Sequence, residues 1–328
     1  MDSILSVVPP EEVSAASTSH NRNHMAFTMR FYDLLWQEIV QKNPYLSPAE
    51  QRQLQSHYPT IMASKRCHFE LLATVYASRR CTSVQHIWNC RSPLVFDAGC
   101  GYGSESFLFA AAGASVVAAD LSPEQVAIAR KRQRYYEDCF GKAFDIEFIA
   151  CDLNDYRPAV SDLSLTWIAS VLAAVRDQEA LLARIHAATR PGGEIMITDM
   201  NLLNPLFLVR EWRRRRQAKR RFPTFARHAN FLAMLLRRDR RGARLFKERQ
   251  GPPFDDVQFF TPVSLRQLLV TVGFTNVRIS YSGFLPPLWA RPLLELETVL
   301  AAVPLLRTLG YFYLTRAQKS YQGFTSKD

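Results

Sequence analysis

The first part of the chain carries apolar residues at helical spacing. Such a pattern covers residues 25–41 and returns over residues 61–79, which predicts a helix for each segment. Between them, the Ser-Pro-Ala-Glu of residues 47–50 predicts a helix start, because serine caps, proline suits the first turn and glutamate closes a capping box. We therefore expect a helical cap over residues 25–92. The polar residues 1–24 show no sustained period and are expected to be a disordered leader.

From residue 93 onward, short apolar runs alternate with helical periods. The predicted strands cover residues 94–97, 115–120, 145–150, 164–169 and 194–199. The predicted helices between them cover residues 104–112, 123–138 and 177–189, and a turn at 190–193 precedes the fifth strand. Further along the chain, a helix at 262–272 and a strand at 276–281 are expected. Strands separated by helices are typical of an α/β fold in which a parallel sheet has helices on both faces.

The composition limits the class of protein. The 328-residue chain is 48% hydrophobic, which is enough to form a sizeable core and too much for a disordered protein. No stretch approaches the roughly 18–20 uncharged apolar residues that a membrane span requires. The N-terminus opens with an acid, Asp2, and lacks the basic and then apolar pattern of a signal peptide. These features favour a cytoplasmic protein.

The cysteines do not suggest a disulfide framework or a metal site. The chain has six of them, none in a CxxC pair: Cys67, Cys81, Cys90, Cys100, Cys139 and Cys151. A chain of this length does not need disulfides for stability, so we interpret them as free thiols of a reducing compartment. The paired ligand spacing of a zinc site is also missing, and no metal is expected.

Positive charge is concentrated in one segment. The chain has a net charge of +11, but residues 210–249 contain 16 Lys and Arg and only three Asp and Glu, a net charge of +13. The rest of the chain is therefore nearly neutral. Apolar residues at helical spacing in this segment predict a basic helical insert, residues 201–255, that follows the fifth strand as a lid. Residues 256–328 are expected to complete the sheet and to add an apolar C-terminal segment.

A glycine-rich turn follows the first predicted strand. Asp97 stands at the strand end, and Gly99, Gly101 and Gly103 follow it. Glycines let a backbone approach a ligand closely, but a dinucleotide site requires the spacing G-x-G-x-x-G, and here position 104 is Ser104. The Asp97 carboxylate would also repel a pyrophosphate and attract a cationic ligand. S-adenosylmethionine, which carries a sulfonium and an ammonium group and no phosphate, fits this turn better.

Two further acids follow the next two strands. Asp120 comes roughly 20 residues after the first glycine, a position suited to the ribose hydroxyls of an adenosine cofactor. Asp152, followed by Leu153, comes after the third strand and can accept a hydrogen bond from an adenine amine. Because the carboxyl ends of parallel strands share one edge of a sheet, the three acids are predicted to meet in one site.

The strings DAGCGYG, VVAADLS, ACDLND and RPGGEIMITDMN together resemble a class I S-adenosylmethionine-dependent methyltransferase. The resemblance covers about residues 93–200, with a weaker echo to residue 283. It implies a Rossmann-like, seven-stranded, mostly parallel sheet and S-adenosylmethionine as the cofactor. It also implies a set of cofactor-binding residues in which the end of the fourth strand lies under the methionine. These residues are Asp97, Gly99, Cys100, Gly101, Gly103, Asp120, Leu121, Asp152, Leu153, Trp167 and Ala169.

The resemblance leaves the catalytic base open. Members of this family frequently have a histidine a few residues past the fourth strand, but residues 170–175 read SVLAAV here. The candidates are Tyr32 on the N-terminal helix, Asp199 at the end of the fifth strand and His228 in the basic insert. The histidines within helical patterns, His68, His86 and His186, are interpreted as packing or surface residues.

The basic insert and the apolar tail favour a small or lipid-linked methyl acceptor, methylated on oxygen, and peripheral contact with an anionic membrane. Methylation of nitrogen or carbon is nearly as compatible, and a solvated helix also explains the insert. An RNA methyltransferase is a weaker alternative, because no Asn/Asp-Pro-Pro-aromatic string follows the fourth strand, so nucleic acid is a disfavoured partner. A non-catalytic cofactor-binding protein and a dehydrogenase also remain alternatives, and the oligomeric state stays open.

Overall fold

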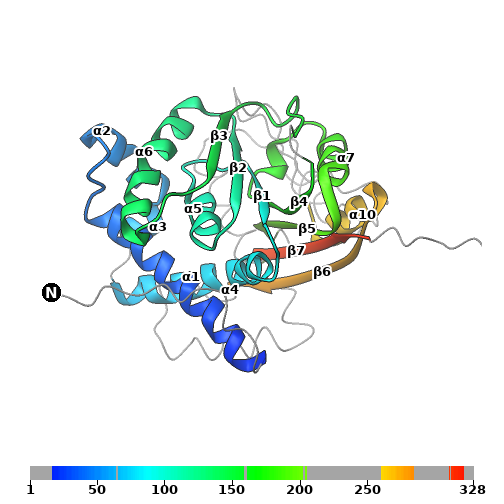
Figure 1. The fold of residues 1–328 in the computed structure, drawn as a ribbon, viewed down its shortest axis with the longest axis horizontal. Helices are drawn as coiled ribbons and strands as arrows, with labels where there is room; N and C mark the ends of the chain where they lie inside the picture. The colour runs from blue at the N-terminus through cyan, green and yellow to red at the C-terminus, as the bar shows by residue number, and fades with distance from the viewer. Residues whose placement is uncertain are drawn as a thin grey trace, which may run out of the picture.

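A central sheet organises the computed structural model, which describes residues 17–63, 66–158, 161–201, 204, 260–283, 310 and 312–320 (Figure 1). Over these residues the sheet has seven strands in the order β3-β2-β1-β4-β5-β7-β6. The strands are β1 (Leu94–Ala98), β2 (Ser115–Asp120), β3 (Ile146–Ala150), β4 (Leu163–Ala169), β5 (Thr189–Met200), β6 (Phe274–Ser282) and β7 (Phe312–Lys319). Strands β1 to β5 pair in parallel, whereas β7 runs antiparallel between β5 and β6. The predicted α/β fold with a mostly parallel sheet is confirmed.

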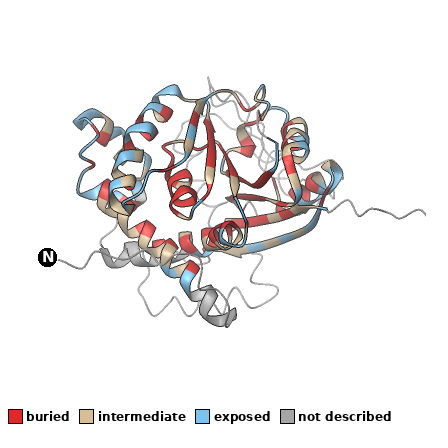
Figure 2. Cartoon of the chain, in the orientation of Figure 1, coloured by how far each residue is buried: buried red, intermediate tan, exposed pale blue. Residues whose placement is uncertain are grey.

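Helices cover both faces of the sheet. One layer comprises α1 (Ser17–Val40), α4 (Arg66–Trp88), α5 (Ser104–Ala111) and α6 (Pro123–Phe140), with the shorter α2 (Pro48–His57) and α3 (Pro59–Ala63) at its edge. The other layer comprises α7 (Gln178–Ala188) and α10 (Pro262–Val272), and a 3-10 turn, Leu172–Ala174, follows β4. Each layer packs its own apolar core against the sheet. The buried residues therefore gather along the strands and on the inner faces of the helices (Figure 2).

The two cores show which way each strand residue points. Trp167 and Met196 pack in the core of α4 and α5, whereas Ile197 packs in the core of α7 and α10. Because successive strand residues point to opposite faces, Thr198 lies on the same face as Met196, and Asp199 on the face of Ile197. Asp97 pairs in register with Trp167 and so lies on the side of α4 and α5.

Capping residues fix several helix starts where the sequence predicts them. The Ser47 hydroxyl accepts a hydrogen bond from the Glu50 amide, and the Glu50 carboxylate accepts one from the Ser47 amide, which completes a capping box. Ser122 caps α6, and Thr261 caps α10 in the same reciprocal way with Ser264. Each such cap typically contributes about 1 kcal/mol to helix stability.

The N-terminal helices extend beyond the predicted limits. Helix α1 begins at Ser17 rather than at residue 25, so residues 17–24 are helical where a disordered leader was expected. His24 is buried against Trp88, and a helix held by packed residues propagates through neighbouring polar positions. The single helix predicted over residues 61–79 is wrong in extent. The structure has two helices there, α3, which ends at Ala63, and α4, which begins at Arg66 and continues to Trp88.

Two features of the sheet differ from the sequence interpretation. The predicted turn at 190–193 lies within β5, which starts at Thr189 and passes through a bulge before regular pairing resumes at Glu194. Strand β7 was not predicted, because Phe312–Lys319 follows an apolar stretch interrupted by prolines, and its own residues mix aromatic and charged types. The long-range pairing with β5 and β6 makes it a strand.

Several expectations fall on residues outside the described ranges. Of the predicted basic insert 201–255, only Asn201 and Asn204 are described, and residues 1–16 and most of the C-terminal apolar segment are likewise not covered. Over the described part of the chain, no helix combines the length and the apolar character that crossing a membrane requires.

Candidate cofactor site

The glycine turn lies where β1 ends and α5 begins. The amides of Gly99 and Cys100 both donate to the Ala119 carbonyl, at 2.7 and 3.0 Å, which holds the turn against the end of β2. Gly99 has a φ angle of +84°, and a Cβ atom there would lie 2.3 Å from a methyl carbon of Val171. A side chain at this position is therefore excluded by both the backbone conformation and the space.

Gly103 closes the turn at the N-terminus of α5. Its φ angle is +82°, and a Cβ atom would approach the rings of Phe107 and Phe148 at 3.0–3.1 Å. The following helix thus begins directly beside the turn, with its first amides directed towards the carboxyl edge of the sheet. The spacing of glycines in the sequence is explained by these local constraints.

Asp120 joins the glycine turn to the end of β2. One carboxylate oxygen accepts a hydrogen bond from the Gly101 amide at 2.8 Å, and the other accepts from the Ser122 amide at 2.9 Å. Each carboxylate oxygen has a second lone pair, and the side chain is only half-buried. Asp120 can therefore accept hydroxyl donors such as those of a ribose while it keeps the turn in place.

Asp97 lies beneath the turn and is almost fully buried, with 2% of its surface exposed. Its carboxyl accepts a hydrogen bond of 2.5 Å from the Ser106 hydroxyl, and among the described residues no Lys or Arg forms an ion pair with it. Burial, together with the negative charge of Glu105, raises the pKa of Asp97 to about 8. A cationic ligand nearby would favour the ionised form, so the site suits a cation better than a phosphate.

The third acid follows β3. One oxygen of Asp152 accepts hydrogen bonds from the backbone and side-chain amides of Asn154, at 2.8 and 2.6 Å, and the other lies 3.7 Å from Arg176. Leu153, next to it, is buried, whereas Leu121 after β2 is 39% exposed. The structure thus brings Asp97, Asp120 and Asp152 to one edge of the sheet, and their roles towards a cofactor stay predictions.

The remaining predicted cofactor residues lie in different surroundings. Trp167 is fully buried, packs edge-on against Phe109 at 5.7 Å, and its indole N–H has no partner among the described residues. Ala169 is half-buried at the end of β4. Cys100 is buried, and burial raises the pKa of its thiol, so it is held as a neutral group within the turn.

The structure separates the candidate catalytic residues. Tyr32 stacks on Tyr76 in the helical cap, and burial raises its pKa well above the usual range, which disfavours a phenolate. Asp199 is buried on the opposite face of the sheet from Thr198, and burial raises its pKa to about 6. His228 lies outside the described residues. None of them is thereby assigned a catalytic role.

Two neighbouring arginines of α4, missed by the sequence analysis, reach the carboxyl ends of the strands. Arg80 pairs with Glu105 and lies 5.6 Å above the Trp167 ring. Arg79 donates a hydrogen bond of 3.2 Å to the Thr198 hydroxyl at the end of β5. Both side chains are buried. Two consecutive arginines in a helix with a partly apolar surface are the only sequence signal that could have indicated them.

Two donors of Arg79 have no partner among the residues that the structure describes. Its Nε and Nη2 atoms make no hydrogen bond within the described structure, although the guanidinium stacks on the Phe312 ring at 4.0 Å. Burial and the charge of Arg80 lower the pKa of Arg79 to about 9. A buried cation with unpaired N–H groups favours an anionic ligand, because the ligand would satisfy both the charge and the donors.

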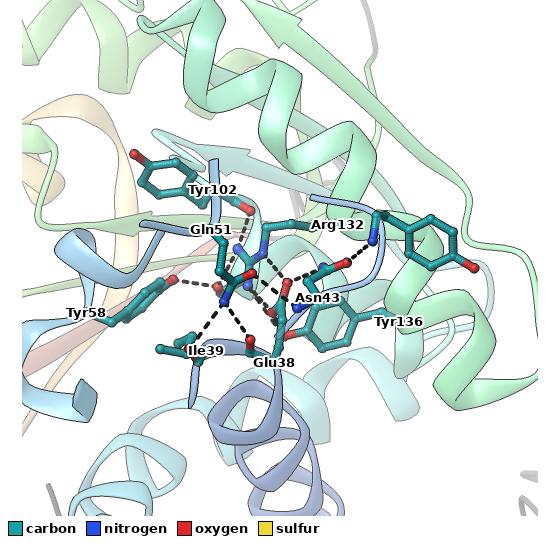
Figure 3. Close-up of polar contacts among 10 residues, drawn as sticks. Glu38, Ile39, Asn43, Gln51, Tyr58, Tyr102, Arg132 and Tyr136 are labelled. Carbon is teal, nitrogen blue, oxygen red and sulfur yellow. Dashed lines mark hydrogen bonds and ion pairs between the residues drawn. The ribbon is translucent and has the colours of Figure 1, made fainter. Parts of the chain in front are cut away.

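A buried polar network holds the helical cap on the glycine turn (Figure 3). Glu38 of α1 and Arg132 of α6 form two hydrogen bonds of 2.6–2.7 Å, and both side chains are fully buried. Arg132 also donates to the Tyr102 carbonyl within the turn, at 2.6 Å. Tyr58, which follows α2, shares a hydrogen bond of 2.6 Å with Ser104. The position of the cap relative to the turn is therefore fixed through buried contacts.

Further donors complete this network around Glu38. The Tyr136 hydroxyl and the Asn43 amide each donate to the Glu38 carboxylate at 2.7 Å, and Gln51 of α2 donates to the Glu38 carbonyl. Glu38 thus receives a donor at each carboxylate oxygen besides Arg132. A buried ion pair is tolerated when its remaining hydrogen-bonding capacity is satisfied in this way.

The combined geometry distinguishes between the classes of cofactor. A dinucleotide-binding sheet typically has the parallel order 3-2-1-4-5-6, whereas here the antiparallel β7 lies between β5 and β6. Asp97, which is buried and has no ion-pair partner within the described ranges, and the half-buried Asp120 fit a ligand that carries positive charge and hydroxyl donors. These residues fit S-adenosylmethionine, and the predicted roles of Asp97 towards its cationic part and of Asp120 towards its ribose stay predictions.

Fold and site define a class I S-adenosylmethionine-dependent methyltransferase domain, and S-adenosylmethionine is its cofactor. Residues 95–193 match the family described as "Methyltransferase domain". The malonyl-[acyl-carrier protein] O-methyltransferase of Serratia marcescens is 32% identical over 106 residues, which are 32% of this chain and 38% of that protein. The enzyme of the same name from Salmonella typhimurium gives the same identity and coverage. The chain thus spans about two fifths of the length of these curated relatives.

Solved structures with a similar course of the chain include two S-adenosylmethionine-dependent methyltransferases. The one from Mesorhizobium loti has a TM-score of 0.44 and 15% identity, covering 75% of this chain and 100% of its own. The one from Archaeoglobus fulgidus has a TM-score of 0.44 and 17% identity, covering 74% and 92%.

The described cysteines form no disulfide, and the acids above give no metal centre. Cys81, Cys90, Cys100, Cys139 and Cys151 are free, as predicted, and the Cys67 side chain is not described. Across the described ranges, no group of three or more His, Cys, Asp and Glu side chains is arranged to hold a metal ion.

Proposed function

We propose that this chain transfers the methyl group of S-adenosylmethionine to a carboxylate oxygen of a small or carrier-linked molecule. The observation that supports this acceptor is Arg79, a buried cation with two nitrogens that lack partners in the described structure. The curated relatives are named for O-methylation of malonyl-[acyl-carrier protein], which agrees with an acceptor on a carrier.

The position of Arg79 suits the acceptor rather than the cofactor. Thr198, its hydrogen-bond partner, pairs in register with Ala169 at the end of β4. The glycine turn follows β1, on the other side of β4 in the sheet. Arg79 therefore lies on the same face as Asp97, displaced along the sheet towards β5. A group held by Arg79 would approach the cofactor from the β5 side of the glycine turn.

The paired arginines have separate tasks in this proposal. Glu105 neutralises Arg80, and this pairing lowers the pKa of Glu105 in spite of its burial. Arg79 has no acidic partner among the described residues and so keeps its charge for a ligand. Guanidinium groups bind carboxylates through two parallel hydrogen bonds, which would fix the orientation of the acceptor oxygens.

A carboxylate acceptor would not require a catalytic base. S-adenosylmethionine supplies a methyl group that its sulfonium has already activated. A carboxylic acid of ordinary pKa, about 4, is ionised at neutral pH and is a nucleophile without proton removal. The protein then contributes mainly alignment of the acceptor and exclusion of water. The absence of a histidine in residues 170–175 is consistent with this chemistry.

The test measures methyl transfer from labelled S-adenosylmethionine to a panel of short-chain dicarboxylic monothioesters, free and carrier-bound. The variant Arg79→Met should lower kcat/KM for the acceptor by about 30-fold or more, because it removes one partner of a buried charge pair worth at least about 2 kcal/mol. Cofactor affinity should change little. Arg266→Met, at an exposed position of α10, is the matched control.

Arg79→Lys should restore less than full activity, since lysine keeps the charge but cannot form the two parallel bonds. The proposed acceptor would be wrong if Arg79→Met loses no acceptor affinity, or if amines are methylated and carboxylates are not. Cytoplasmic location remains a prediction from the sequence.

A further inference from the structure

A second polar site lies at the opposite end of the sheet from the glycine turn. A cavity of about 460 Å³ is lined there by the last turns of α4, the bulged start of β5 and one side chain of β7. The lining side chains include His86, Cys90, Arg190, Glu194 and Arg316. Glu194 pairs with Leu165 in the first half of β4, so the cavity is remote from the carboxyl edge that holds the three acids.

The side chains at this cavity form a continuous chain of contacts. Arg316 binds Glu194 through hydrogen bonds of 2.9–3.2 Å. An oxygen of Glu194 lies 3.7 Å from Nδ1 of His86. Nε2 of His86 lies 2.8 Å from the Ser164 carbonyl and 3.5 Å from the Cys90 sulfur.

This geometry fixes the proton arrangement on His86. The Ser164 carbonyl can only accept, so Nε2 of His86 carries a hydrogen and donates it. That hydrogen is shared with the Cys90 sulfur, which acts as an acceptor in its thiolate form. Glu194 favours a second proton on Nδ1. These contacts favour a protonated His86 beside the thiolate form of Cys90, with the carboxylate of Glu194 held in place by Arg316.

The local charges act in the same direction. Burial opposes charge on both groups, but the contact with Cys90 and the charge of Glu194 raise the pKa of His86. The hydrogen bond and charge of His86, with a contribution from Arg190, lower the pKa of Cys90. Arg91 also lines the cavity and is exposed. No acid besides Glu194 is among the residues that line it.

Cys81 provides an internal comparison. It lies on α4, is likewise half-buried and is also a free thiol. Its sulfur donates to the Ser78 carbonyl at 3.3 Å, and burial raises its pKa. The two cysteines thus differ in their partners more than in their exposure.

We propose that Cys90 is a nucleophilic thiol that forms a mixed disulfide with a small anionic disulfide, such as oxidised glutathione, bound in this cavity. The thiolate sulfur attacks one sulfur of the ligand, the S–S bond of the ligand breaks and a new S–S bond to Cys90 forms. The departing thiolate takes a proton from water, so atoms and electrons balance with no other oxidant. Arg91 and Arg190 receive the carboxylates of the ligand.

The first experiment measures the alkylation rate of each thiol in the native protein with limiting iodoacetamide and peptide mass mapping between pH 6 and 8.5. At pH 6.5, Cys90 should react at least about 10-fold faster than Cys81, because each unit of pKa difference changes the thiolate fraction tenfold. The alkylation rate of Cys90 should also vary less with pH than that of Cys81. Equal rates and parallel pH profiles for the two thiols would overturn the proposal.

The second experiment compares oxidised glutathione with the neutral bis(2-hydroxyethyl) disulfide. The mixed disulfide at Cys90 should form faster with oxidised glutathione, and Arg190→Gln or added salt should reduce this preference. Equal rates for both disulfides would refute the anionic ligand. His86→Gln should bring the Cys90 rate down to that of Cys81, with thermal unfolding used to verify that the variant is folded. If this variant does not fold, the comparison of the Cys90 and Cys81 alkylation rates in the unmodified protein still tests the proposal.

Discussion

Single side chains determine the electrostatics of the cofactor site, and Asp97 is the most informative of them. Its pKa of about 8 lies above the ordinary carboxyl value of 3.8, so the folded, ligand-free protein keeps it largely protonated at neutral pH. A ligand cation placed beside it requires the ionised form. Binding of S-adenosylmethionine should therefore release a proton below pH 8.

The expected result is a dissociation constant for S-adenosylmethionine that rises up to about tenfold for each pH unit below pH 8. Calorimetry in buffers of different ionisation enthalpy measures both the constant and the proton count. Asp97→Asn should weaken binding and abolish the proton release. Asp152→Asn, at a half-buried acid, should leave the proton release intact. A dissociation constant that is independent of pH would contradict this assignment.

Raising the pH should strengthen cofactor binding through Asp97, whereas it should lower the stability of the ligand-free fold. A carboxyl whose pKa is raised on folding binds more protons in the folded state, so its burial costs stability increasingly from about pH 4 to pH 8. The same Asp97→Asn variant should accordingly have a higher Tm than the parent at pH 8 without ligand.

At this scale, the sequence reveals residues whose role is local. The glycines of the turn and Asp120 are read directly from spacing, because their contacts lie within a strand, a turn and the next strand. Arg79 and the pair of His86 and Cys90 could not be predicted in the same way. His86 and Cys90 are only four residues apart, but Glu194 of β5, which contacts His86, and Thr198 of β5, which contacts Arg79, are distant in sequence, and only the folded chain brings them close.

At the scale of elements, the contact between the helical cap and the glycine turn depends on the ion pair of Glu38 and Arg132. Replacing one partner leaves a buried charge without compensation, which typically costs about 3–5 kcal/mol. Glu38→Gln should therefore lower the free energy of unfolding by several kcal/mol, measured by urea denaturation. It should also weaken cofactor binding, since Arg132 holds the Tyr102 carbonyl.

The control for this prediction is Lys131→Ala, on the same helix. Lys131 forms an ion pair with Glu50 but is 51% exposed, and such surface pairs contribute about 1 kcal/mol or less. A cost for Glu38→Gln no larger than that for Lys131→Ala would show that the buried network is not important for stability.

Prediction of the elements from the sequence succeeds where a periodic pattern and a cap coincide. Helix α2 begins at its predicted cap, α6 and α10 begin at the predicted residues, and five parallel strands match to within a few residues apart from the early start of β5. It fails at β7, because FYLTRAQK does not alternate apolar and polar residues and so gives a weak local strand signal. It also misplaces the start of α1, since packing against α4 extends that helix beyond its apolar period.

At the scale of the whole molecule, positive charge is concentrated in one segment that follows the predicted cofactor-binding core in the sequence. Residues 210–249 carry a net charge of +13, and the remainder is close to neutral. Basic residues near an anionic membrane surface each contribute about 1 kcal/mol, and this attraction is screened by salt. A methyltransferase with such a segment could meet a lipid-linked acceptor at a membrane surface.

Liposome flotation tests this arrangement. The chain should float with vesicles that contain phosphatidylserine, should not float with neutral phosphatidylcholine vesicles, and should dissociate as salt increases from 50 to several hundred mM, roughly in line with counterion screening. Replacing Arg213, Arg214, Arg215 and Arg216 with glutamine should reduce the binding, while methyl transfer to a free carboxylate acceptor should be retained. Binding that is absent, or insensitive to both salt and lipid charge, would refute the membrane hypothesis. Gel shifts with total RNA under the same salt conditions test nucleic-acid binding separately. Since contacts to RNA phosphates also weaken with salt, RNA complexes at low salt without any binding to vesicles would favour the RNA alternative.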